Sequence, residues 1–308
     1  MTNALSADTA PATRAPFGRV LTAMVTPFGE DDGLDVDGAQ RLATHLVDTG
    51  NDGLIINGTT GESPTTSDEE KDRLLRAVVE AVGDRARVVA GVGTNDTQHT
   101  LELARAAEKA GAHGLLVVTP YYSKPPQSGL QRHFSAAADA TGLPVMLYDI
   151  PGRTGVQIAR ETYDVLARNE HIVAVKDAVG DFYAGAWLMR ETSLALYSGD
   201  DAVNLAWLAY GAAGVVSVVG HVAAREYAAM VGAVDDGDLV TARRINDQLL
   251  PAVRGLMTHT QGAITAKASL QLLGQLEHRT VRPPLVDATD DEITMLGDEL
   301  RAAHLLKD

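Results

Sequence analysis

Lys176 is the residue of this chain whose setting points most directly to chemistry. It lies in the apolar run 172–178 (IVAVKDA), which has the length and β-branched content of a buried strand. Burial penalises the charged ammonium, so a lysine in this setting tends to lose its proton and become a nucleophilic amine. A neutral amine that faces a carbonyl compound forms a Schiff base. The alternative is a structural lysine paired with a carboxylate, although the adjacent Asp177 points to the opposite face of a strand.

Hydroxyl and guanidinium groups follow other apolar runs of the same kind. Thr59 and Thr60 lie in GTTGES (58–63), where paired hydroxyls beside backbone amides suit a carboxylate or phosphate; the alternative is an ordinary strand-to-helix connection. The turn is not a P-loop, because no Gly-Lys-Ser/Thr follows it. Arg153, in YDIPGRTG (148–155), has a fork geometry that fits a carboxylate, and its alternative is a loop salt bridge.

Two of the eight tyrosines, Tyr122 and Tyr148, also stand at the ends of apolar runs. A phenol there can pass protons to a carbinolamine intermediate, and the alternative is a core aromatic with a satisfied hydroxyl. A lysine amine with hydroxyls beside it indicates chemistry of the class I aldolase type.

Composition excludes several other classes of protein. The net charge of −15 argues against nucleic-acid binding, because no basic stripe is present to neutralise phosphates. The chain has no cysteine, which rules out disulfides, thiolate metal sites and cysteine nucleophiles. The nine histidines form no metal-binding motif, so we predict no metal and no cofactor. His221, just after the last apolar run, is the one histidine that we expect could line the site.

The apolar runs alternate with amphipathic stretches, and this alternation predicts the fold. The amphipathic stretches predict helices, one of them opened by a capping box at residues 67–70 (SDEE). Eight β/α units predict a parallel sheet closed as a (β/α)8 TIM barrel, in which reactive groups lie at the carboxyl ends of the strands. An open doubly wound sheet is the competitor, but the first run lacks its glycine fingerprint. The eight runs are 20–26, 53–57, 87–93, 114–119, 144–150, 172–178, 194–198 and 214–219.

The remaining segments complete the predicted organisation. We expect residues 1–16 to form a disordered N-terminal tail, because they lack the apolar region of a signal peptide. We expect residues 17–235 to form the barrel catalytic domain. Residues 236–308 predict a small all-helical C-terminal domain, with helices near 237–260, 262–275 and 290–304. No long apolar span is present, so we expect a cytoplasmic protein that does not enter a membrane.

Five motifs in this order resemble one family over the chain from about Phe17 to the C-terminus. GTTGES (58–63), TPYYSKPP (119–126), YDIPGRTG (148–155), VKDA (175–178) and SGDD (198–201) are similar to the dihydrodipicolinate synthase family, also called the 4-hydroxy-tetrahydrodipicolinate synthase family. It belongs to the N-acetylneuraminate lyase superfamily. The resemblance implies a (β/α)8 barrel with a C-terminal helical domain, and a homotetramer built as a dimer of dimers.

The resemblance also implies a reaction and roles for individual residues. The reaction is the condensation of pyruvate with L-aspartate 4-semialdehyde, a lyase step toward diaminopimelate and lysine. Lys176 would form the imine with pyruvate. The proton relay would comprise Tyr148, Thr59 and, from a neighbouring subunit, Tyr122. The implied substrate-binding residues are Thr60 for the pyruvate carboxylate, Arg153 for the semialdehyde carboxylate, and Gly199 and Val216 through backbone contacts near the nucleophile.

Other readings of the same residues stay open. Sialate lyases and keto-deoxy-sugar aldolases of the superfamily share the lysine and the tyrosine, so another pyruvate-dependent acceptor is an alternative. A non-catalytic keto-acid-binding protein on the same fold is a second alternative. Feedback inhibition by lysine is expected to be weak or absent. Ser63, Asn95 and Tyr121 match the family's lysine site, but Lys71, with Asp68 and His99, replaces other residues there and would repel a cationic ligand.

Overall fold

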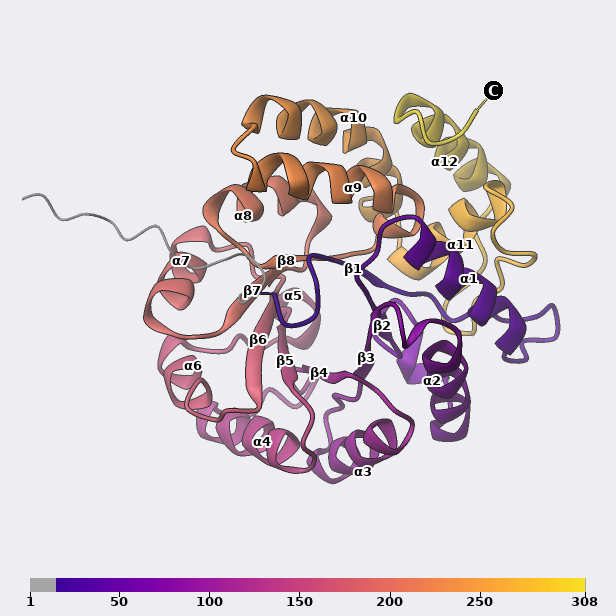
Figure 1. Cartoon of the computed structure of the whole chain (residues 1–308). Coiled ribbons are helices and arrows are strands. Elements are labelled where there is room, and N and C mark those ends of the chain that lie inside the picture. The colour runs from indigo at the N-terminus through magenta and orange to yellow at the C-terminus, as the bar shows by residue number, and fades with distance from the viewer. Residues whose placement is uncertain (1–14, 308) are drawn as a thin grey trace, which may run out of the picture.

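Eight parallel strands close into a barrel in which every strand pairs with its two neighbours along the chain, and β8 pairs with β1 (Figure 1). This computed structural model describes residues 15–307, so nearly all of the predicted tail lies outside the described residues. The TIM-barrel prediction is confirmed, and each strand falls within its predicted run. The strands are β1 (Val20–Ala23), β2 (Gly53–Ile56), β3 (Arg87–Gly91), β4 (Gly114–Val118), β5 (Val145–Asp149), β6 (Ile172–Asp177), β7 (Ala195–Ser198) and β8 (Gly214–Ser217).

Side chains that alternate along the strands fill the interior of the barrel. Phe17 closes the amino end, where its backbone N–H donates to the Tyr197 hydroxyl at 3.2 Å. A Cβ at Gly114 would lie 2.4 Å from the Phe17 ring, so only glycine leaves room for this plug. Because successive residues of a strand face opposite sides, the inward positions reach the carboxyl end of the barrel as Tyr148 on β5 and Lys176 on β6.

Helices on the outside cover the barrel, as the periodicity predicted. Their apolar stripes pack on the outward faces of the strands, and the predicted capping box at Ser67 and Glu70 is present at the start of α2. The helices that follow the first seven strands are α1 (Val36–Asp48), α2 (Asp68–Val82), α3 (Thr97–Lys109), α4 (Gln127–Asp139), α6 (Arg160–Leu166), α7 (Phe182–Glu191) and α8 (Asn204–Tyr210).

Four further helical segments were not expected from the sequence. Helix α9 (Gly220–Asp235) follows β8 and contacts both β1 and α10, so it is buried on two sides and its alanine-rich sequence has no polar stripe that would reveal a helix. The short segments η2 (Ser63–Thr65), α5 (Pro151–Thr154) and η3 (Asp201–Val203) lie in the loops after β2, β5 and β7. Of the motif residues, Ser63, Arg153 and Asp201 therefore lie in single helical turns.

The C-terminal helices α10 (Leu239–Met257), α11 (Gly262–Leu272) and α12 (Asp290–Ala302) gather at one side of the barrel beside α9 (Figure 1). Their apolar cluster includes Tyr227 and Met230 of α9, which ties them to the barrel. The division between residues 235 and 236 falls between α9 and α10 and stays a prediction. Within residues 15–307, no helix combines the length and the apolar character needed to cross a bilayer.

Candidate active site

Lys176 and Tyr148 lie side by side at the carboxyl end of the barrel. They are register partners on the paired strands β6 and β5, and both side chains point into the barrel. The Lys176 Nζ lies 4.3 Å from the centroid of the Tyr148 ring. Each residue is 5% exposed. The structure thus places the predicted nucleophile in direct contact with the predicted proton carrier.

The environment of Lys176 favours its neutral form. Burial lowers the pKa of its ammonium from 10.5 to about 8, the negative charge of Asp201 opposes this shift, and the positive charge of Arg153 adds to it. An amine with this pKa is partly unprotonated near neutral pH, whereas an exposed lysine is almost wholly charged. Lys176 can therefore act as a nucleophile without a dedicated base.

Asp201 is the buried carboxylate whose negative charge raises the pKa of Lys176, and several hydrogen bonds hold it in place. Its carboxylate accepts hydrogen bonds from the backbone amides of Val218 and Val219 at 2.8 and 3.1 Å, and from the Tyr227 hydroxyl at 3.0 Å. The Ser217 hydroxyl also donates to it. The SGDD motif drew attention to this segment, but no role for Asp201 was predicted, because its partners lie at the end of β8, directly after β8 and on α9.

Tyr148 keeps its proton at neutral pH. Burial raises the pKa of its phenol to about 12, with Arg153 lowering it and Asp200 raising it. A protonated phenol beside an amine can donate a proton to a developing alkoxide and take it back later. The hydroxyl therefore suits a relay rather than a permanent base.

A cavity of about 250 Å³ opens next to Tyr148 and brings three predicted residues together. Thr59, Tyr148 and Arg153 line it, coming from the loops and strand ends of β2 and β5. Its volume suits a small keto acid and an acceptor better than a large ligand. The full lining consists of Asn57, Gly58, Thr59, Ser63, Pro64, Gly91, Gly93, Leu116, Val118, Tyr121, Tyr148, Ile150, Arg153 and Thr154.

The other predicted binding residues lie around this centre. A Cβ at Gly199 would lie 2.9 Å from Cγ of Lys176 and 2.8 Å from the Asp177 carbonyl oxygen, so a glycine lets β7 approach the nucleophile. Val216 belongs to the interior cluster that contains Tyr148. Thr60 is 8% exposed and follows Thr59 directly, but it does not line the cavity.

Tyr122 is the predicted relay residue that the single chain does not bring to the site. Its side chain is 89% exposed, and its backbone has a φ of 72°, a conformation that non-glycine residues rarely adopt. Its backbone N–H donates to the Thr154 carbonyl at 3.3 Å. The loop therefore presents an aromatic hydroxyl outward from the mouth of the barrel.

His221 does not line the cavity and is a buried structural residue. Its Nε2 accepts a hydrogen bond from the Val25 amide at 3.0 Å, and its Nδ1 lies 2.7 Å from the Val218 carbonyl oxygen. Burial lowers its pKa to about 4, against the raising effect of the Val218 bond, so the ring is neutral and joins the segment after β1 to the segment after β8.

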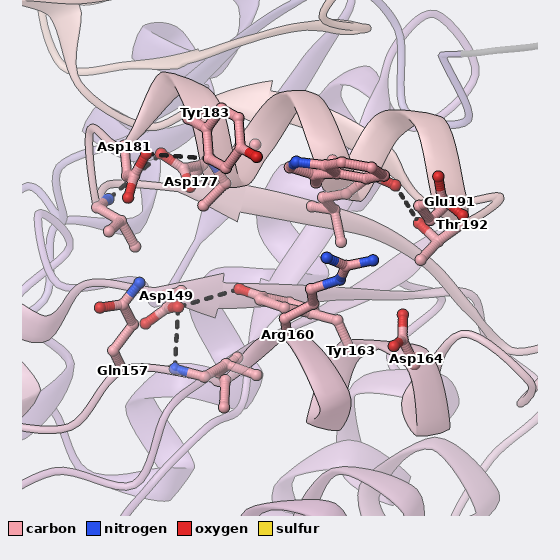
Figure 2. A pocket seen from close by; sticks show the side chains of 17 residues that line it. Asp149, Gln157, Arg160, Tyr163, Asp164, Asp177, Asp181, Tyr183, Glu191 and Thr192 are labelled. Atoms are coloured by element: carbon pink, nitrogen blue, oxygen red, sulfur yellow. Dashed lines mark hydrogen bonds between the residues drawn. The ribbon is translucent and has the colours of Figure 1, made fainter.

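The outward neighbours of the two central residues form a second, separate pocket. Asp149 and Asp177 face away from the barrel axis and line a pocket of about 390 Å³ between α6 and α7 (Figure 2). Asp149 accepts hydrogen bonds from the Tyr163 hydroxyl and the Ile158 amide, both at 3.0 Å. Burial raises the pKa of Asp149 to about 7. As the alternation predicted, Asp177 is not the partner of Lys176.

The fold and the site define a class of enzyme. A (β/α)8 barrel that carries a lysine of lowered pKa beside a tyrosine at its carboxyl face has the arrangement of a class I aldolase-type lyase. The model of the dihydrodipicolinate synthetase family matches residues 16–303. The chain belongs to this family, as the sequence motifs predicted.

Individual relatives agree with this assignment. The chain is 67% identical over 290 residues to a 4-hydroxy-tetrahydrodipicolinate synthase of Kineococcus radiotolerans, covering 94% of each sequence. Among solved structures it is similar to the synthase of Cyanidioschyzon merolae with lysine bound, at 41% identity, a TM-score of 0.91 and coverage of 95% and 100%. It is also similar to the chloride-inhibited synthase of Acinetobacter baumannii complexed with pyruvate, at 32% identity, a TM-score of 0.90 and coverage of 94% and 100%.

Proposed function

We propose that this protein condenses pyruvate with L-aspartate 4-semialdehyde to give 4-hydroxy-tetrahydrodipicolinate, through a Schiff base on Lys176. The observation that carries the proposal is the buried Lys176 amine, with a pKa of about 8, in contact with the Tyr148 ring. The names of the relatives and the pyruvate complex of one of them support the choice of substrates.

The first half of the reaction builds the nucleophile. The Lys176 amine adds to the keto carbon of pyruvate, and the carbinolamine loses water to give the imine. Tyr148 donates the proton that lets hydroxide leave as water, because its phenol is protonated at the working pH. Loss of a proton from the methyl carbon then gives the enamine. We assign the pyruvate carboxylate to the Thr59–Thr60 turn, where hydroxyls and backbone amides lie together.

The second half joins the substrates and frees the enzyme. The enamine carbon attacks the aldehyde carbon, whose oxygen takes up a proton and becomes the ring hydroxyl. The amino group of the semialdehyde then attacks the imine carbon, closes the ring and releases the Lys176 amine. We assign the carboxylate of the semialdehyde to Arg153, which lines the same cavity as Tyr148.

We further propose that the relay is completed between subunits of a homotetramer. Tyr122 is 89% exposed on a strained backbone at the mouth of the barrel, so its hydroxyl is available to a neighbouring chain rather than to its own site. Relay residues Thr59 and Tyr148 would then come from one subunit and Tyr122 from another.

Acceptor specificity tests the proposal. Turnover of pyruvate is measured with aspartate semialdehyde, and with N-acetylmannosamine and glyceraldehyde in its place. The proposal predicts turnover with the semialdehyde that exceeds turnover with either sugar-type acceptor by at least a hundredfold. Preference for N-acetylmannosamine or glyceraldehyde would instead assign a sialate lyase or a keto-deoxy-sugar aldolase. An Arg153→Met variant should lose the preference, since Arg153 is assigned to the carboxylate that only the semialdehyde carries.

A further inference from the structure

A second buried lysine, Lys267, joins the C-terminal helices to the turn that carries Thr59 and Thr60. It lies on α11 and is fully buried, and its Nζ donates to Glu62 Oε1 at 2.5 Å and to the Thr280 carbonyl at 2.6 Å. The other oxygen of Glu62 accepts from the Arg282 backbone amide at 2.9 Å. None of these groups lines the cavity or has a part in the proposed reaction.

Glu62 is the strained residue of the GTTGES turn. It has a φ of 55°, which is unfavourable for a residue with a side chain, so surrounding contacts must hold it there. In this conformation its backbone N–H donates to the Thr59 carbonyl at 3.1 Å. Its own carbonyl accepts from the Thr65 and Thr66 hydroxyls at 3.1 and 2.9 Å. The backbone of Glu62 therefore sets the path of the two threonines before it.

Arg282 anchors the same turn from a second direction. Its guanidinium donates to both carboxylate oxygens of Glu70 at 2.8 and 2.6 Å, and to the Thr65 carbonyl at 2.9 Å. The Phe28 ring lies beside both cations, 4.2 Å from Lys267 Nζ and 4.1 Å from Arg282 Cζ. The loop after β1, the turn after β2 and the C-terminal segment thus meet at one cluster.

Lys267 and Lys176 differ in the partners that they find. Burial lowers the pKa of both amines to about 8, and both lie beside an aromatic ring, but the Lys267 amine also has a carboxylate at hydrogen-bond distance. The Lys267 Nζ is bonded to Glu62 and to the Thr280 carbonyl, and it is fully buried away from the cavity, so it is not placed to attack a carbonyl compound. Its contribution must therefore be structural, and its contacts locate that contribution at the Glu62 turn.

We propose that Lys267 is a positioning residue of the active site: by fixing the Glu62 carboxylate, it holds the turn in the conformation that presents Thr59 and Thr60 to pyruvate. This inference rests on the proposed function, since it concerns the same site. The C-terminal helices would then contribute to catalysis, because α11 supplies the lysine that fixes Glu62.

The test compares Lys267→Met with variants that separate positioning from stability. The double variant Lys267→Met/Glu62→Gln removes the unpaired buried charge that the single substitution leaves behind. Leu256→Ala, in the apolar cluster of the C-terminal helices, is the matched control, because it weakens the same region without touching the turn. All are assayed as the full chain, under conditions where each is folded by circular dichroism.

The readouts are pyruvate imine formation, trapped with borohydride over a range of pyruvate concentrations, and its pH profile. We expect both Lys267 variants to need at least tenfold more pyruvate for half-maximal trapping, while Leu256→Ala behaves as wild type. The apparent pKa of the reaction should stay that of the wild type, because Lys267 does not contact Lys176. If Lys267→Met does not fold, Arg282→Met tests the same turn and is expected to weaken pyruvate trapping.

The results distinguish the positioning role of Lys267 from the proposed Schiff-base function. Wild-type pyruvate dependence in the folded double variant, or an equal loss in Leu256→Ala, would overturn the positioning role and leave the proposed function intact. Absence of any trapped adduct in the wild-type protein would overturn the Schiff-base function and the positioning role with it.

Discussion

Replacing Lys176 by methionine is expected to stabilise the folded protein while abolishing imine formation. Burial lowers the pKa of Lys176 from 10.5 to about 8. One unit of pKa difference between the folded and unfolded states corresponds to about 1.4 kcal/mol, so the folded state is penalised by about 3 kcal/mol wherever both states are protonated. That condition holds below pH 8. The penalty declines between pH 8 and 10.5 and vanishes above, because the unfolded chain then loses its proton too.

Urea unfolding at fixed protein concentration, at pH 7 and at pH 10, measures this effect. Lys176→Met should gain about 3 kcal/mol in the free energy of unfolding at pH 7, and less than about 1 kcal/mol at pH 10. Lys267→Met is the matched control with the opposite sign, since it leaves the Glu62 carboxylate buried and unpaired, at a cost of about 3–5 kcal/mol. Destabilisation of Lys176→Met at both pH values would contradict this expectation, because it would mean that the Lys176 ammonium is paired and stabilises the folded state.

Three further predictions concern catalysis and its control. The rate of pyruvate imine formation should fall tenfold for each pH unit below the Lys176 pKa of about 8, and stopped-flow measurement of an apparent pKa near 10.5 would contradict this. Tyr122→Phe should lower kcat by about a hundredfold. Co-assembly with inactive Lys176→Met should restore part of the activity, because the intact Tyr122 of one subunit can then reach the intact Lys176 of the other. No recovery would place Tyr122 in the site of its own chain. Free lysine should inhibit weakly, because the Lys71 ammonium, bonded to the Thr66 carbonyl at 2.6 Å, repels a cationic ligand; half-inhibition at physiological concentration would show otherwise.

The barrel was predictable because its strands are buried on both faces and therefore read as short, continuous apolar runs. Lys176 stood out against such a run, and the alternation of side chains was enough to turn it inward and Asp177 outward. The carboxyl ends of parallel strands share one face, so Thr59, Tyr148 and Arg153 could be predicted as neighbours, and they line one cavity. Helix α9 was missed because burial on two sides removes the polar stripe that marks a helix.

The contacts that the sequence could not reveal join residues far apart in the chain. Glu62 and Lys267 are separated by 205 positions, and neither lies in a pattern that names its partner. Asp201 is likewise defined by donors that follow β8. The role proposed for Tyr122 requires a second subunit, which no property of one chain specifies. Resemblance to the family supplied that expectation, and the exposed tyrosine is consistent with it.

Trapping of the pyruvate adduct is the most direct test of a Schiff base on Lys176. The protein is incubated with pyruvate and borohydride and digested, and the peptides are measured by mass spectrometry, with Lys176→Met as the control. We expect a reduced pyruvate adduct on the peptide that contains Lys176 and none on the peptide that contains Lys267. A wild-type protein that turns over pyruvate without an adduct on Lys176, or that carries the adduct on another lysine, would contradict it.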